Sequence, residues 1–133
     1  MAGSFHGGLM QVLYCAIGEG VQAGNEIRIH LTGRLDDRLY LFVEAAWGHP
    51  LEAVTGFHAT APCDFGWNAH VLELRDGGRF EVGALSVRIE YLRDRASPVR
   101  PLRNVRLCVE APCGMSVAHL PRARPMRLRQ KAG

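Results

Sequence analysis

The C-terminal segment has the residue types and spacing to bind a polyanion. Five positive charges fall within the last 13 residues, where no acidic residue occurs, and they are Arg122, Arg124, Arg127, Arg129 and Lys131. Guanidinium groups form charge-assisted hydrogen bonds with phosphates, and the intervening prolines disfavour a regular helix. We expect a flexible arm that becomes ordered on a nucleic acid; a solvated terminal charge run is the alternative. Because the whole chain carries +3, residues 1–120 carry −2, and basicity belongs to the tail.

The cysteines have the donor type of a zinc site but not its spacing. Cys15, Cys63, Cys108 and Cys113 include no C-x2-C pair, and the C-x4-C pair at 108–113 contains Pro112 and lies beside a strand pattern. Four unevenly spaced cysteines also do not indicate a disulfide framework. We therefore expect ordinary thiols, no metal site and no cofactor.

No group of residues has the spacing of a catalytic site. Asp36 and Asp37 fall in a predicted hairpin, where acidic residues commonly initiate turns, and no partner or pocket is indicated for them. Gly77 and Gly78 lie between strands with no following helix, so they indicate a turn rather than a phosphate cradle. No Ser-His-Asp, P-loop or dinucleotide pattern occurs, and we expect no enzymatic activity and no catalytic residue.

The composition is that of one folded domain. The chain has 133 residues, of which 47% are hydrophobic and 22% charged. No run approaches the roughly 18 to 20 apolar residues of a spanning helix, and the first eight residues lack the pattern of a signal peptide. These features predict a cytoplasmic protein without a membrane partner.

Most of the chain has the pattern of β-strands. Polar and apolar residues alternate at 26–31 and 86–91, and 39–45 and 105–111 are β-branched, aromatic and leucine-rich runs that end at glycine or proline. No window of twelve residues has a helical apolar stripe. We predict an all-β fold, with at most two helical turns at 52–60.

An internal repeat divides the chain. VEAAWGHPLEAV at 43–54 aligns without a gap on VEAPCGMSVAHL at 109–120, and the triplet at 27–29 matches the one at 87–89 if one residue is inserted. The copies are 9–54 and 71–120, joined by a linker at 55–70, in one β domain at 1–120 followed by the tail at 121–133. Units this small rarely fold alone, so we expect one shared core, a single-chain pseudo-dimer. Chance similarity between two β-rich halves is the alternative.

Three short motifs of the second copy carry a family resemblance: LELRDG at 72–77, VRLCVEAP at 105–112 and SVAH at 116–119. They resemble the opening Leu-x-Arg-Arg-x-Gly, the Val-Arg-Ile-Gly-Ile-x-Ala-Pro and the Ser-Val-His-Arg of the carbon storage regulator (CsrA/RsmA) family of translational regulators. The resemblance implies an intertwined β-sandwich or barrel in which the first strand of one copy pairs with the last strand of the other. Residues 9–15 and 115–120 would then be neighbours in one sheet.

The same resemblance implies post-transcriptional regulation through single-stranded RNA that contains GGA. The resemblance implies RNA-binding positions at Arg75, Val117 and His119, and the tail following the last strand is expected to replace lost charge with Arg122, Arg124, Arg127 and Arg129. This chain departs from the family where Cys15 and Ala16, and then Ala53, stand at positions of the family's arginines, so one composite site keeps only His119 and the other only Arg75. We expect one working site, the one with Arg75.

Each of these residues has a plainer interpretation. Arg75 is then a surface arginine on an edge strand, and His119 a strand histidine with no special role. The alternative function is a protein-interaction or structural module that kept the fold and lost RNA binding. A continuous edge formed by Arg75, Arg88, Arg106 and the tail would favour RNA, whereas scattered arginines would favour a protein partner. The aromatic residues of the linker, Phe57, Phe65 and Trp67, are expected to pack over an open end of the core.

Overall fold

The part of the chain that the structure describes forms eleven strands in two antiparallel sheets. The computed structural model describes residues 8–63, 66–92 and 103–122. Sheet A has the order β1-β10-β9-β8-β5, with the bounds Gly8–Cys15, Val105–Pro112, Leu85–Tyr91, Arg79–Val82 and Leu51–Glu52. Sheet B has the order β11-β2-β3-β4-β7-β6, with the bounds Val117–Leu120, Gly20–Ala23, Ile27–Leu35, Arg38–Ala46, Trp67–Arg75 and Phe57–Pro62.

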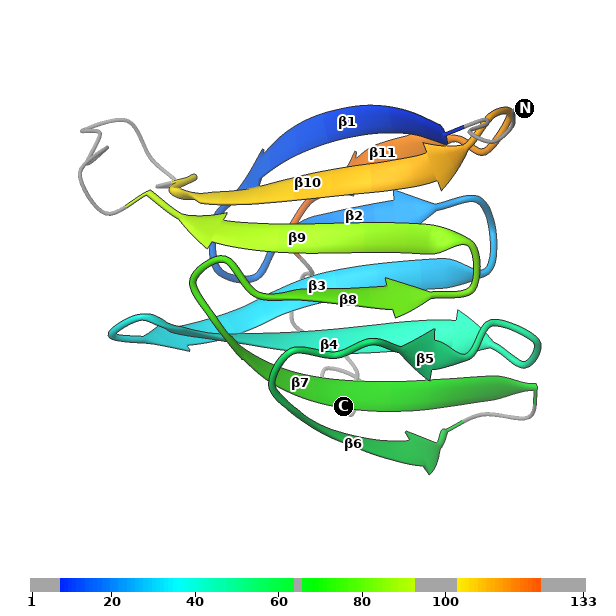
Figure 1. Cartoon of the computed structure of the whole chain (residues 1–133), viewed down its shortest axis with the longest axis horizontal. Coiled ribbons are helices and arrows are strands. Elements are labelled where there is room, and N and C mark those ends of the chain that lie inside the picture. Colours follow the sequence, from blue (N-terminus) through cyan, green and yellow to red (C-terminus); the bar gives the residue numbers. More distant parts are fainter. Residues whose placement is uncertain (1–7, 64–65, 93–102, 123–133) are drawn as a thin grey trace, which may run out of the picture.

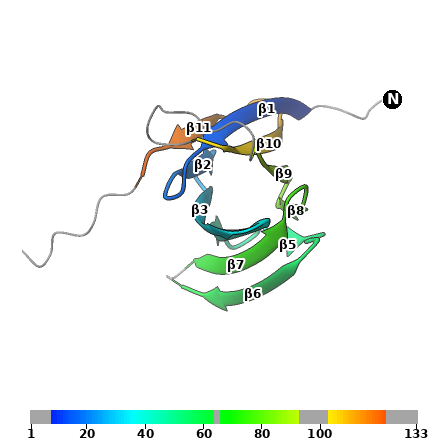
Figure 2. The same cartoon turned by 90° about the vertical axis from the view of Figure 1, so that its left-hand side faces the viewer.

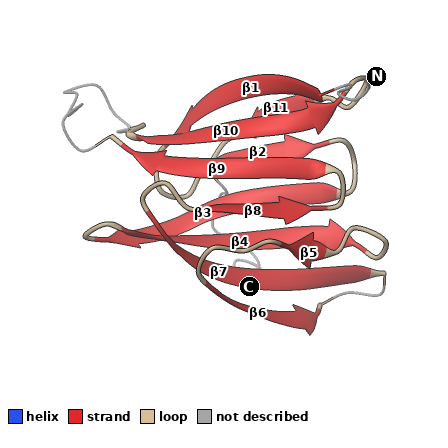
Figure 3. Ribbon diagram, in the orientation of Figure 1, coloured by secondary structure: helices blue, strands red, loops and turns tan. Residues whose placement is uncertain are grey.

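The predicted all-β class is confirmed. The alternating runs at 26–31 and 86–91 fall on β3 and β9, and those at 39–45 and 105–111 fall within β4 and β10. Every regular element among the described residues is a strand (Figure 3). No described helix is therefore long and apolar enough to cross a membrane.

The best place for any short helix was 52–60, and none forms there, because this stretch contains the end of β5 and most of β6. Gly56 brings the backbone so close to β7 that a Cβ there would lie 2.3 Å from the Glu73 carbonyl oxygen. β6 pairs with β7 and forms the outer edge of sheet B, where Phe57 is 63% exposed. Phe57 thus extends a sheet edge rather than covering an open end of the core, and Phe65 lies outside the described residues.

Alternation of apolar side chains builds one core between the sheets. In β4, the buried positions are every second residue, from Leu39 to Ala45, and β3 and β9 follow the same alternation. The largest buried side chains come from both sheets and include Ile29, Leu41, Leu72, Phe80, Ile89 and Leu107. Each such side chain contributes about 1.5–3 kcal/mol by leaving water.

Each sheet contains strands from both halves of the chain, with three consecutive strands of one half flanked by strands of the other (Figure 1). β1 pairs with β10 and β5 with β8 in sheet A, while β7 pairs with β4 and β11 with β2 in sheet B. The expected pairing of 9–15 with 115–120 is therefore wrong. The eight-residue β1 finds a partner of its own length in β10, whereas β11 has only four residues and pairs with the equally short β2.

Two corners of the fold have the same hydrogen bonds. The Gly18 N–H donates to the Leu31 carbonyl at 2.8 Å, and the Gly77 N–H donates to the Ile89 carbonyl at 2.8 Å. Leu31 therefore occupies the position of Ile89, and the expected match of residues 27–29 with 87–89 is two residues out of register. The expected match places one extra residue in the 71–120 part, whereas the extra residue lies in the turn between β2 and β3, which has three residues against two between β8 and β9.

Candidate functional site

β1 and β11 are edge strands of different sheets, and they lie side by side at one end of the molecule (Figure 2). We call this place the seam. An open pocket of about 290 Å³ lies at the seam, lined by Val12, Leu13, Tyr14, Arg103 and His119. The pocket therefore combines an aromatic ring, a guanidinium group and an imidazole from three separate segments of the chain.

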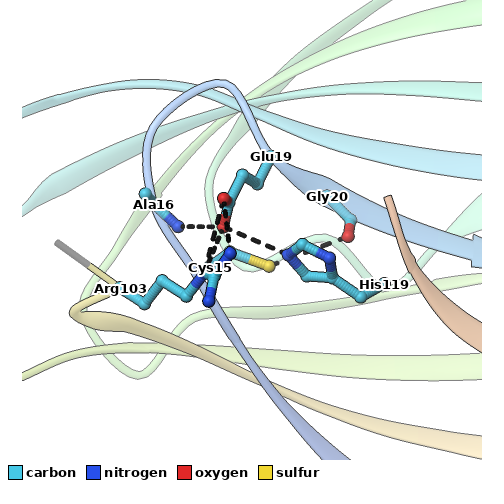
Figure 4. Close-up of polar contacts among 6 residues, drawn as sticks. All are labelled: Cys15, Ala16, Glu19, Gly20, Arg103 and His119. Atoms are coloured by element: carbon cyan, nitrogen blue, oxygen red, sulfur yellow. Dashed lines mark hydrogen bonds and ion pairs between the residues drawn. The ribbon is translucent and has the colours of Figure 1, made fainter. Parts of the chain in front are cut away.

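A buried carboxylate organises the seam. Glu19 is 3% exposed, in the turn between β1 and β2. Arg103 donates to its carboxylate from Nε at 3.0 Å and from Nη2 at 3.2 Å, and the Ala16 N–H donates at 2.9 Å. His119 Nε2 lies 3.1 Å from Glu19 Oε1 (Figure 4). One carboxylate thus joins the β1–β2 turn, the segment before β10, and β11.

The surroundings keep Glu19 charged and Cys15 neutral. Burial by itself raises the pKa of Glu19, but the hydrogen bonds from Arg103, the Ala16 N–H and His119 outweigh it and lower this pKa to about 2. Burial, followed by the negative charge of Glu19, raises the pKa of the Cys15 thiol to about 12. Cys15 is therefore a protonated thiol with little nucleophilic reactivity.

The seam contains residues of the types that bind metals, but the Arg103 guanidinium group already occupies the carboxylate among them. The donor atoms of Cys15, Glu19 and His119 all lie within 4.8 Å of one another. Arg103, however, donates to both oxygens of Glu19, and a metal would also require the Cys15 proton to leave. The arrangement therefore favours a fixed guanidinium group over a bound ion.

The tail begins at the seam. Val117 and His119 lie in β11, and Arg122 follows two residues after this strand ends. The Arg122 side chain covers the β1–β2 turn, since a Cβ on Gly18 would lie 3.1 Å from its Cγ. Arg124, Arg127 and Arg129 lie outside the described residues.

Arg75 lies far from the seam, at the end of β7, which three strands separate from β11 in sheet B. Its Nη1 is 3.4 Å from Asp37 Oδ2. The neighbouring pocket, of about 390 Å³, is lined by Arg34, Asp36, Asp37 and Tyr91. The guanidinium group of Arg34 lies over the Tyr91 ring, 4.4 Å from its centroid. Two carboxylates thus accompany the two arginines, which disfavours the approach of a phosphate.

The arginines do not form a continuous edge. Arg88 and Arg106 both pair with Glu90 in sheet A, whereas Arg75 pairs with Asp37. Six of the nine described arginines have carboxylate partners, namely Arg28, Arg38, Arg75, Arg88, Arg103 and Arg106. Scattered arginines favour a protein partner over RNA for the folded domain at 1–120. The features that favour RNA are confined to the seam and the tail.

Sequence reasoning missed Glu19, Arg103 and Tyr14. The corner at 74–78 makes the same backbone turn with Leu74 in place of Cys15 and Gly78 in place of Glu19. The turn therefore does not require a carboxylate. The signal in the sequence was that Glu19 stands between two glycines of a turn, where its backbone conformation gives no reason for an acidic residue. Arg103 had no such signal, because its neighbour Glu19 is 84 residues away in the chain.

Comparisons of the chain with models of protein families, with curated proteins and with solved structures find no match.

Proposed function

We propose that this protein is a CsrA-like post-transcriptional regulator that binds single-stranded RNA at the seam. One observation carries the proposal: an exposed tyrosine, an arginine and a histidine line one open pocket at the root of the arginine-rich tail. A ring and planar cations suit unpaired bases, and a basic arm suits the phosphate backbone.

The strand order supports a pseudo-dimer of two repeats. In sheet A, the first and last strands of the first copy flank three strands of the second, in the order β1-β10-β9-β8-β5. In sheet B the roles are exchanged, in the order β11-β2-β3-β4-β7, and β6 is added outside β7. Such an exchange is what two linked copies would produce if each completed the other's sheet. The CsrA-like identity rests on this order together with the motifs.

Tyr14 and the cations have distinct roles in the proposal. Tyr14 is 42% exposed, and its ring stacks on an unpaired base. Glu19 fixes Arg103 beside this ring, which lowers the entropy lost when a base is bound. Arg122 and the tail neutralise phosphates, which determine affinity more than base identity.

The proposal assigns one working site to each chain, and places it on the His119 side rather than the Arg75 side. The counterpart of β1 is β7, whose outer edge is occupied by β6. The arginine of β7, Arg75, is paired with Asp37, and both Asp36 and Asp37 line the neighbouring pocket. We therefore expect one RNA for each chain.

The test is a fluorescence titration of a short hairpin with a GGA loop at several salt concentrations. Five tail cations on a single strand give a salt slope of roughly −0.7 × 5, or about −3.5. Deletion of 121–133 is expected to abolish most binding, and Tyr14→Ala to weaken it about 5- to 150-fold, the range for loss of a stacked base. Phe57→Ala, which removes an exposed aromatic ring on β6, is the matched control.

Two results would contradict this assignment. If Arg75→Ala weakened binding more than Tyr14→Ala, the site would lie at the other end of sheet B. If the unmodified protein did not bind the hairpin, the second candidate, a protein-interaction module, would replace the first. Two observations favour that second candidate. The arginines that pair with carboxylates are scattered over the fold, and the described residues contain nine arginines against eleven acidic residues, so they offer no excess of positive charge to an RNA.

A further inference from the structure

Over the described ranges, sheet A has five strands and sheet B has six. β7 lies beside β4 as β1 lies beside β10, with antiparallel pairing along the whole strand in both cases. Outside β7, sheet B gains a sixth strand, β6, which pairs with residues 68–73. Outside β1, sheet A ends. The backbone groups on the outer side of β1 therefore have no strand partner among the described residues.

β1 lacks the features that protect sheet edges. Natural edge strands are kept apart by charges, prolines or short length. β5 has two residues, β11 has four and is followed by Pro121, and β6 ends at Pro62. β1 has eight residues, with no charge and no proline. Its exposed side chains are apolar or aromatic: Leu9 is 58% exposed, Met10 59%, Val12 48% and Tyr14 42%.

β6 indicates that the outer side of such a strand is accessible. The last strand of the first copy, β5, ends sheet A, and it lies close to β7 in both views (Figures 1 and 2). In the same way β11 ends sheet B close to β1. β6 nevertheless pairs with β7 over six residues, and it continues the sheet away from β5 (Figure 2). A strand of similar length therefore fits beside β1 without displacing β11.

We propose that β1 pairs antiparallel with β1 of a second copy of this chain, so that sheet A continues through a two-fold dimer. The sequence of β1 is self-complementary in the register centred on Val12. Met10 then lies opposite the partner's Tyr14, a favourable contact of sulfur with an aromatic ring, and Gln11 lies opposite the partner's Leu13. No like charges meet across the axis, because β1 has none.

The second copy is preferred to a different partner for two reasons. The strand offers no charge with which to select a charged peptide, and its own apolar side chains match themselves across a two-fold axis. The interface is small, roughly below 1,000 Å² in total, because it consists of one strand from each copy. We therefore expect a reversible dimer with a dissociation constant on the order of micromolar.

Dimerisation would compete with the proposed RNA site. Val12, Leu13 and Tyr14 line the pocket at the seam, and a second β1 would lie against the same strand. RNA is then expected to shift the protein toward monomer. The dimer itself does not depend on the RNA proposal, since it follows from the strand edge alone.

The test is sedimentation velocity of the nuclease-treated full chain over about 1 to 200 µM. The unmodified protein is expected to show a monomer–dimer equilibrium. Val12→Lys is expected to weaken the dimer at least tenfold, because two lysines meet at the axis. Val71→Lys is the matched control: Val71 is 50% exposed, on the strand that β6 already covers, and its substitution is expected to leave the dimer unchanged.

A second measurement fixes the register. With Cys63 and Cys113 replaced by serine, Val12→Cys is expected to form a disulfide-linked dimer under mild oxidation, and Val71→Cys is not. Circular dichroism establishes that each variant is folded. A protein that stays monomeric at 200 µM, or a dimer that Val12→Lys leaves intact or that Val71→Lys weakens equally, would overturn the proposal.

Discussion

At the scale of single residues, Glu19 is the most constrained polar group of the seam. A buried carboxylate is costly unless hydrogen bonds and a counter-charge compensate for the lost water. Arg103, His119 and the Ala16 N–H supply that compensation from three segments. The seam therefore depends on contacts that no local sequence pattern contains.

Glu19 is expected to make the stability of the fold depend on acid. Its pKa in the folded protein is about 2, below the ordinary 4.5, so the folded state binds its proton less tightly than the unfolded state does. Its contribution is fully present above pH 4.5 and is lost as the pH falls toward 2. The check is the free energy of unfolding in urea at pH 7, 4 and 3. Glu19→Gln is expected to remove this part of the pH dependence, and an unchanged profile would show that another group causes it.

At the scale of elements, local patterns identified strands but not their partners. The alternating runs at 26–31 and 86–91 could be assigned because alternation depends only on neighbouring residues. The pairing of β1 with β10 joins residues from 90 (Cys15 and Val105) to 104 (Gly8 and Pro112) apart, and the resemblance assigned the wrong partner. β6 was missed because Gly56 and Pro62, which limit a helix to two turns, equally mark the two ends of this strand. The pocket residues Tyr14 and His119 come together only through these long-range pairings.

Gly56 is expected to be essential for the attachment of β6. Gly56→Ala would place a Cβ 2.3 Å from the Glu73 carbonyl oxygen and force β6 away from β7, at a cost of about 1–3 kcal/mol. Gly33→Ala is the control: its nearest neighbour would be the Tyr40 ring at 3.8 Å, and a change within about 0.5 kcal/mol is expected. Thermal unfolding of both variants measures the difference. Equal stability of the two variants would mean that β6 adjusts without cost.

At the scale of the whole molecule, the sheets cannot be completed by either part of the chain alone. β1 and β5 have their partners in β10 and β8, and β7 and β11 have theirs in β4 and β2. Chains that end at residue 63 or begin at residue 66 would therefore each lose a share of both sheets. The shared core follows from this exchange of strands.

The two separate pieces are expected to be unfolded alone and to fold when mixed. Residues 1–63 and 66–133 are produced separately and examined by circular dichroism and by gel filtration, first apart and then together. A β-sheet spectrum and cooperative thermal unfolding are expected only for the mixture. A piece that folds cooperatively by itself would contradict the shared core.

The pairing of β1 with β10 also governs how the chain folds on the ribosome. Cys15 leaves the ribosome 90 residues before its partner Val105, so β1 has no partner strand until β10 has been synthesised. Meanwhile the hairpin of β3 and β4 can form, because its strands are neighbours in the sequence. During this time β1 is unpaired. It is uncharged and mostly apolar, and unpaired strands of this kind make a nascent chain prone to aggregation. Slow translation of the second half should therefore lower the yield of folded protein, and early capture of β1 by a chaperone should restore it.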